Sequence, residues 1–410
     1  MTNTLRTPPV ASRRPAAPLS RAVLATVVLV NAIAPLATDM YVPAFPAVGF
    51  DLGAGATQVQ LTLTTFFVGM ALGQLVGGPV SDARGRRVPL LASLVVLTLA
   101  SVACALSPTI GAMMAARLVQ GFSGGWAMVT ARAVVVDLTA GPSLVRSLNV
   151  VAGVGGIAPV AGPLLGAVIL QLTHWRVSFW VVAALGAAMI VAVAVGVRES
   201  LPADRRHAGG LAQLGRSAGQ VLAQPRFVAY LIIMAFSMGV TFAYVATSAF
   251  ILQTMNGLSP VLYSLDFAAN AVGLAAATLL AARLAGRVST RVVIGAGLVA
   301  TGAAGVLLLV GSLWFGTPLP VAVAGFFLLM TAQGLVGANA GALASAEVPR
   351  HPGTGSAVLG FLQWCMAGVI APIAGLGGDR TATPMAVIIV VLAAASLGAL
   401  LVLARPGGRR

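Results

Sequence analysis

Long apolar segments separated by short polar stretches run through almost the whole chain. An α-helix needs about 20 mostly apolar residues to cross the hydrocarbon core of a bilayer. Twelve segments approach or exceed this length, and they lie at 21–46, 57–80, 88–107, 109–131, 145–171, 176–197, 226–253, 260–283, 291–312, 318–345, 354–376 and 382–404. The pattern therefore predicts an all-α membrane protein with twelve transmembrane helices.

The longest internal polar stretch divides these segments into two sets of six. It predicts a six-helix bundle at 21–198, a cytoplasmic linker at 199–225 and a second six-helix bundle at 226–404, with a disordered N-terminus at 1–20 and a short tail at 405–410. A weak repeat relates the halves, because Arg87 and Arg291 each close a basic loop after the second helix of their half. Two bundles with pseudo-two-fold symmetry fit this pattern.

Composition and charge support a membrane protein, with 59% hydrophobic and 8% charged residues. The net charge is +15, and all 24 basic residues are Arg. Most of them fall in turns on one side of the predicted membrane, among them Arg84, Arg86, Arg87, Arg132, Arg198 and Arg283. The other side keeps Arg176 and Arg380. This asymmetry predicts that both termini are cytoplasmic, and the lack of basic clusters interleaved with aromatic residues argues against nucleic-acid binding.

The two cysteines, Cys104 and Cys365, lie in separate predicted helices without partners at metal-ligand spacing. We therefore expect no disulfide, no metal site and no cofactor. A phosphate-binding loop of the form G-x-x-x-x-G-K-[ST] is impossible in a chain without Lys, so ATP coupling would need another subunit.

One carboxylate lies inside the first apolar segment, where a charge costs roughly 3 kcal/mol on insertion scales. This residue, Asp39, is a candidate for the proton-binding group of a transporter driven by a proton gradient. Arg117 lies roughly 12 Å into the fourth segment, at a comparable depth, and the two side chains are expected to pair. Alternation between pairing and apolar burial would let Asp39 load and release a proton, and a static buried ion pair is the alternative.

The loop after the second predicted helix, residues 78–87, reads GPVSDARGRR. Its spacing of Gly, Asp, Gly and paired Arg resembles the loop signature of the major facilitator superfamily. This resemblance implies a cytoplasmic gate formed by Gly78, Asp82, Arg84, Gly85, Arg86, Arg87 and Asp137. We expect Asp82 to lie at the N-terminus of a helix in the other half, and the arginines to pair with acids such as Asp137. A simple positive-inside loop is the alternative.

Two further motifs resemble the same family. Residues 117–125, RLVQGFSGG, are similar to its intramembrane Arg motif. The predicted fifth helix is similar to the antiporter signature of the drug-exporting branch, through Gly153, Pro159, Gly162, Pro163 and Gly166. Small residues allow close helix packing and proline bends a helix. Two family glycines are replaced here by Ala158 and Ala167, yet the signature favours export over uptake.

Residues 39–46, 131–137, 242–250 and 270–273 resemble the bicyclomycin and chloramphenicol resistance group of twelve-helix drug/proton antiporters. The resemblance implies a multi-pass protein of the bacterial cytoplasmic membrane that exports small amphipathic molecules in exchange for protons, and a monomer suffices for this fold. It assigns the proton-linked carboxylate to Asp39, with Arg117 as its neighbour. Some multidrug members have a second acid at the position of Asn31. We therefore expect poor handling of lipophilic cations and a preference for neutral or zwitterionic drugs such as chloramphenicol-type compounds.

Polar and aromatic side chains near the middle of the predicted helices are candidates for the substrate-binding wall. They are Asn31, Tyr41, Trp126, Met128, Phe236, Tyr244, Asn270, Asn339, Phe361 and Trp364. Packing or lipid contact is the alternative for each of them. Asp266, a further acid in an apolar segment, either lines the pathway or is hydrated at a helix end.

Several functions remain open at this point. A proton-coupled drug exporter is favoured, and an exporter of an endogenous metabolite or a nutrient importer on the same fold is the alternative. A membrane enzyme or channel is disfavoured, because the chain has no His, Cys and carboxylate constellation and no filter-like repeat.

Overall fold

The computed structural model describes residues 20–139, 142–206, 218–348 and 352–404, and nearly all of them are helical. The helices of the first half are α1 (Arg21–Asp39), α2 (Phe45–Asp51), α3 (Ala56–Arg84), α4 (Arg87–Ala105), α5 (Ile110–Leu138), α6 (Pro142–Leu172) and α7 (Arg176–Gly196). Those of the second half are α9 (Pro225–Ala249), α10 (Pro260–Leu284), α11 (Thr290–Phe315), α12 (Leu319–Glu347), α13 (Pro352–Ala374) and α14 (Thr383–Val402). Short turns complete the elements, namely η1 (Val42–Ala44), η2 (Ala203–Arg205), η3 (Phe250–Met255) and η4 (Gly375–Gly377).

Polar caps and glycines determine where several helices begin and end. Thr109, Ser259 and Ser289 precede α5, α10 and α11, and the hydroxyl of each accepts a hydrogen bond from a first-turn backbone N–H. These bonds satisfy donors that a helix N-terminus leaves unpaired. At the other end of α11, Gly316 adopts φ +66°, a left-handed conformation that glycine reaches without strain.

Ten helical segments in the described ranges are long and apolar enough to cross a membrane. The predicted fourth and fifth spans are also helical, as α5 and α6, although α5 carries Arg117 and Arg132 along its 29 residues. The predicted end of the fourth span near residue 131 is wrong, because α5 continues to Leu138. Residues 131–140 contain neither Gly nor Pro, so the helix is free to extend beyond the predicted end. Arg132 therefore lies within a helix and not in a cytoplasmic turn.

The first apolar segment is not one helix. It was expected to run without a break over 21–46, but α1 ends at Asp39 and the chain resumes as α2 after the turn η1. Pro43 and Pro46 cannot donate backbone hydrogen bonds, and each disfavours helical geometry in the residue before it. Tyr41 N–H accordingly bonds to Thr38 O, in a tighter turn than an α-helix makes.

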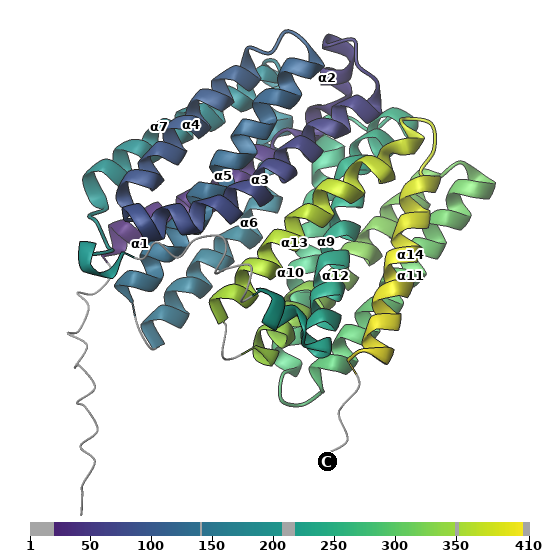
Figure 1. The fold of residues 1–410 in the computed structure, drawn as a ribbon. Helices are drawn as coiled ribbons and strands as arrows, with labels where there is room; N and C mark the ends of the chain where they lie inside the picture. The colour runs from purple at the N-terminus through teal and green to yellow at the C-terminus, as the bar shows by residue number, and fades with distance from the viewer. Residues whose placement is uncertain (1–19, 140–141, 207–217, 349–351, 405–410) are drawn as a thin grey trace, which may run out of the picture.

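The two halves lie side by side, with the purple to teal helices of the first half beside the green to yellow helices of the second (Figure 1). Where they meet, α3 packs against α13 and α6 packs against α10. We call the end that holds the loop between α3 and α4 and the segment 199–206 the basic end. The end that holds α2 and the turns η1, η3 and η4 is the opposite end.

Hydrogen bonds between described residues link the halves away from the basic end. They run from Thr57 Oγ1 to Gly375 O (3.1 Å), from Gln253 Nε2 to Pro43 O (3.1 Å) and from Ser264 Oγ to Pro163 O (3.0 Å). Phe45 of the first half also packs against Phe250 of the second, with ring centroids 5.9 Å apart. These contacts fasten the halves to each other towards the opposite end.

Candidate functional site

Asp39 is the last residue of α1, and its side chain is buried, with 7% exposure. No donor within the described ranges makes a hydrogen bond or ion pair to its carboxyl group. The backbone of α6 passes directly beside it, since a Cβ added to Gly162 would lie 2.7 Å from Asp39 Cβ and one added to Gly166 would lie 2.1 Å from Met40 O. Glycine is required at these two positions because any side chain would force the helices apart.

Arg117 is completely buried on α5, but it does not pair with Asp39. Its Nη1 donates instead to Ala37 O (3.1 Å) and to Gln120 Oε1 (2.8 Å). The expected ion pair is thus wrong for this conformation. The reason is local, because α1 ends at Asp39 and leaves the carbonyl of Ala37 without its helical donor, and a guanidinium is well suited to bind a free carbonyl at a helix C-terminus.

Aromatic rings surround the Arg117 guanidinium. Its Cζ lies 4.3 Å from the centroid of Phe66, 5.1 Å from Tyr41 and 5.7 Å from Phe179. The Nε and Nη2 atoms have no hydrogen-bond partner among the described residues, so these rings supply much of the stabilisation of the charge. Tyr41, a predicted wall residue, is therefore part of this packed cluster, with its hydroxyl 3.1 Å from Thr62 Oγ1.

A polar cluster lies on the second half. Asn270 Nδ2 donates to Asp266 Oδ2 (2.9 Å) and to the Tyr244 hydroxyl (3.0 Å), while Asn270 Oδ1 is buried without a partner in the described ranges. Helix α10, which carries Asn270, packs against α6, the helix beside Asp39. The structure thus brings together Tyr244 and Asn270, which were predicted as wall residues, and adds Asp266 to them.

Three aromatic rings meet between the halves. Phe67 of α3 lies 4.2 Å from Phe242 of α9 and 5.5 Å from Trp364 of α13, measured between ring centroids. Trp364 was predicted as a wall residue, whereas Phe67 was missed. Nothing in the sequence distinguishes Phe67 from other aromatic residues of the second helix, and the contact with the second half is the signal that finds it.

The remaining predicted wall residues do not share one surface. Asn31 is buried and accepts a hydrogen bond from Arg132. Trp126 packs at the contact between α3 and α5, where a Cβ added to Gly77 would lie 2.5 Å from its ring. Asn339 Nδ2 donates to Leu335 O within α12 (2.9 Å). Met128 belongs to the hydrophobic core, Phe236 packs against that core, and Phe361 is half-buried.

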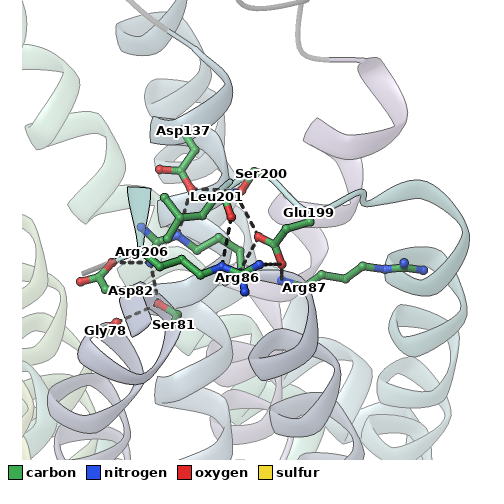
Figure 2. A network of polar contacts seen from close by, with 10 residues as sticks. All are labelled: Gly78, Ser81, Asp82, Arg86, Arg87, Asp137, Glu199, Ser200, Leu201 and Arg206. Carbon is green, nitrogen blue, oxygen red and sulfur yellow. Dashed lines mark hydrogen bonds and ion pairs between the residues drawn. The ribbon is translucent and has the colours of Figure 1, made fainter. Parts of the chain in front are cut away.

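At the basic end, Arg86 is the centre of a polar network (Figure 2). Its Nε donates to Asp137 Oδ2 (2.9 Å), and its Nη1 donates to Asp82 Oδ1 (2.5 Å) and Ser81 Oγ (2.7 Å). Ser200 Oγ donates to the same Asp137 oxygen (3.0 Å). The contact expected between the loop arginines and Asp137 is therefore present.

Asp82, in contrast, makes no hydrogen bond or ion pair to the other half within the described ranges. It pairs with Arg86 one helical turn away, and its side chain is 51% exposed. The prediction of a direct contact between the halves through Asp82 is wrong for this conformation, since the halves meet towards the opposite end. Of the other gate residues, Arg87 Nη2 donates to Ala194 O (2.7 Å), Arg84 is an exposed residue at the end of α3, and Gly78 O accepts a bond from Ser81 Oγ (2.9 Å).

Glu199 completes this network, and sequence reasoning missed it. Its carboxylate accepts hydrogen bonds from the backbone N–H groups of Arg86 (2.8 Å), Arg87 (3.2 Å) and Leu201 (3.0 Å). Burial raises the pKa of Glu199, but these donors and the nearby Arg206 outweigh it and hold the pKa below its usual value. The carboxylate therefore caps the N-terminus of α4.

Gly85, whose φ is +89°, allows the close approach of this cap, since a Cβ there would lie 2.5 Å from Glu199 Oε2. On the antiporter-like helix, Gly162 and Gly166 pack against the end of α1, and Pro163 O accepts a hydrogen bond from Ser264 of α10. The surroundings of Gly153 and Pro159 lie outside the described part of α6.

Comparisons with known proteins agree with this architecture. A family model described as Major Facilitator Superfamily matches residues 27–372. An uncharacterized MFS-type transporter, YdgK of Bacillus subtilis, is 33% identical over 88% of this chain and 90% of that protein. A bicyclomycin resistance protein homolog of Haemophilus influenzae is 26% identical over the same shares. The multidrug resistance protein MdtL of Escherichia coli is 28% identical over 54% of this chain and 56% of that protein.

Solved structures extend the agreement to the fold. A D-xylose-proton symporter superposes with a TM-score of 0.73, at 14% identity, over 94% of this chain and 98% of that one. A bacterial homolog of the human lysosomal transporter Spinster, in an inward-facing conformation, gives a TM-score of 0.70 at 15% identity, over 93% of this chain and 95% of that one. At such identities the likeness concerns the arrangement of the helices alone.

Proposed function

Because the chain belongs to the Major Facilitator Superfamily, and is thus a multi-pass membrane transporter and not an enzyme, we propose that it exports small amphipathic drugs in exchange for protons. The proposal places it in the bacterial cytoplasmic membrane with both termini in the cytoplasm, so that the basic end faces the cytoplasm. The relatives named for bicyclomycin and multidrug resistance support a drug as substrate. A monomer suffices for this activity.

The observation that carries the proposal is the environment of Asp39. A buried carboxyl without a donor is most stable when protonated, whereas hydration or a cationic neighbour favours the charged form. Asp39 lies where α1 ends, beside α6, which in turn packs against α10 of the second half. A rearrangement of α1 against either neighbour would change this environment and release the proton.

The distribution of contacts between the halves supports alternating access. Hydrogen bonds and ring contacts fasten the halves towards the opposite end, while Arg86 and Glu199 form their bonds within the first half. This arrangement is consistent with an inward-facing state. The cytoplasmic gate residues are then available to meet the second half when the transporter turns outward.

The proton gradient supplies enough energy for export. At about 150 mV, one entering proton contributes about 3.4 kcal/mol. This energy sustains a concentration gradient on the order of 10²-fold for a neutral substrate. Because Asn31 replaces a second acid of helix 1, the first half binds one proton at Asp39, and neutral or zwitterionic drugs such as chloramphenicol-type compounds are the preferred substrates.

The test compares the intact protein with Asp39→Asn in a host without its main drug exporters. We expect chloramphenicol resistance with the intact protein and its loss in Asp39→Asn at equal expression. In everted membrane vesicles, addition of the drug should release protons from the lumen only with the intact protein. Asp204→Asn, which changes an exposed acid of η2, is the matched control and should behave as the intact protein does.

Unchanged resistance and proton release in Asp39→Asn would overturn the coupling site. Drug accumulation that rises in cells when the intact protein is present would instead identify an importer.

A further inference from the structure

We propose that Arg132, held by Asn31, forms a binding subsite for an acidic group of the transported molecule. This inference rests on the proposed export function and narrows its substrates from neutral or zwitterionic drugs to the zwitterionic ones, amphipathic molecules with a carboxylate or a similar anionic group at one end.

The pair is fixed by hydrogen bonds. Arg132 Nε donates to Asn31 Oδ1 (3.1 Å), and Asn31 Nδ2 donates to Val27 O (2.9 Å). Asn31 is buried, with 6% exposure, so its amide is fixed by α1 and in turn orients the guanidinium. The bond uses Nε, and the two Nη groups, the pair that forms a bidentate contact with a carboxylate, make no hydrogen bond to any residue in the described ranges.

The position of Arg132 on α5 turns it towards the interior of the first half. At about 100° per residue, Arg132 lies about 60° around the helix from Arg117 and about 20° from Gly125. Arg117 contacts α1, and Gly125 packs on α3, where an added Cβ would lie 2.3 Å from Met70 O. Arg132 therefore points between α1 and α3. The residue as a whole is exposed, and its Nε reaches the buried Asn31.

No acidic side chain neutralises Arg132. All nine acidic residues of the chain lie in the described ranges, and none forms an ion pair with it. The nearest acid along the helix, Asp137, is bound by Arg86 and Ser200. An uncompensated guanidinium within a helical bundle is costly unless water or an anion satisfies it. In a transport pathway, such a group attracts anions and repels cations.

The spacing suits an elongated molecule. Asn31 and Asp39 are eight residues apart on α1, which corresponds to about 12 Å along the helix. A molecule whose acidic group meets Arg132 can therefore place its apolar body towards Asp39 and the aromatic rings between the halves. The position of Asn31 thus has a positive role, because an acid there would neutralise Arg132 instead of presenting it to the substrate.

The test measures binding to the purified full-length protein in nanodiscs by calorimetry. The probes are chloramphenicol hemisuccinate, which ends in a carboxylate, and its methyl ester, which has nearly the same size without the charge. We expect the acid to bind about 10- to 100-fold more tightly than the ester, as for hydrogen bonds between charged groups. In Arg132→Gln this preference should disappear while the affinity for the ester is kept, and Arg132→Lys should retain part of it.

Arg283→Gln, which removes an exposed arginine at the end of α10, is the matched control and should keep the preference. Equal binding of acid and ester by the intact protein would overturn the proposal whatever the variants do. So would a preference for the acid that persists in Arg132→Gln. Binding needs no proton gradient, so failure of the coupling proposal at Asp39 would leave this result unaffected.

Discussion

Replacing Gly166 by Ala perturbs the closest backbone contact around Asp39. The added Cβ would lie 2.1 Å from Met40 O and 2.8 Å from Met40 C, both backbone atoms that cannot rotate away. A Cβ and a carbonyl oxygen repel each other at separations below about 3 Å, so α6 and α1 must move apart by about 1 Å. Overpacking of this size costs about 1–3 kcal/mol.

A matched variant isolates this steric cost. Gly398 lies within α14, and a Cβ added there meets no atom within 4 Å. Both substitutions gain the same helix propensity, about 1 kcal/mol. The difference between Gly166→Ala and Gly398→Ala is therefore the overpacking term alone.

The assay is thermal unfolding of the detergent-solubilised proteins, followed by intrinsic fluorescence, together with drug efflux from cells. We expect a lower unfolding midpoint and weaker efflux for Gly166→Ala, because the shift of α1 displaces Asp39. Gly398→Ala should match or exceed the wild type in both measurements. Equal midpoints and equal efflux for the two variants would refute the close packing of α6 against Asp39.

Three further outcomes are expected. Asp137→Asn should lower the unfolding midpoint more than Asp82→Asn, because the pair of Asp137 with Arg86 is largely buried whereas Asp82 is half exposed; equal midpoints would contradict this ranking. Glu199 has a lowered pKa, so its charged form stabilises the fold at pH values above its ordinary pKa. The stability of the intact protein should therefore exceed that of Glu199→Gln at neutral pH, and this difference should vanish as the pH falls below about 4. A stability difference that stays constant at all pH values would show that the charge of Glu199 is not its cause. Gln253→Ala removes the hydrogen bond to Pro43 O that links the halves. A cysteine introduced at the opposite end should then react faster with a membrane-impermeant thiol reagent. An unchanged reaction rate would show that this bond does not help to keep that end closed.

The helical segments follow from the sequence because a membrane span has a simple requirement, a long apolar run. The end of α1 at Asp39, within the first apolar run, was harder to predict from the sequence. Pro43 and Pro46 signalled irregular backbone, but they did not show that Arg117 binds the carbonyl of Ala37, which the end of α1 leaves free. That bond joins residues 80 positions apart, a distance over which a local pattern carries no information.

The candidate site shows the same division. The depth of Asp39 and of Arg117 followed from counting residues along helices, and the contact of Arg86 with Asp137 followed from charge and position. The failed pairing of Asp39 with Arg117 depended on helix rotation, which depth alone does not determine. Glu199 was interpreted as the first residue of a polar linker, because its role as a cap of α4 depends on the fold of the loop around Gly85.

The hydrogen bonds that fasten the two halves share one chemical feature, which is that each acceptor is a main-chain carbonyl, of Gly375, Pro43 or Pro163. A main-chain acceptor persists whatever side chain occupies its position, so mutation acts on the donors alone. Substitution of Thr57, Gln253 or Ser264 can therefore weaken the contact between the halves one bond at a time, while Asp39 and the residues around it stay unchanged.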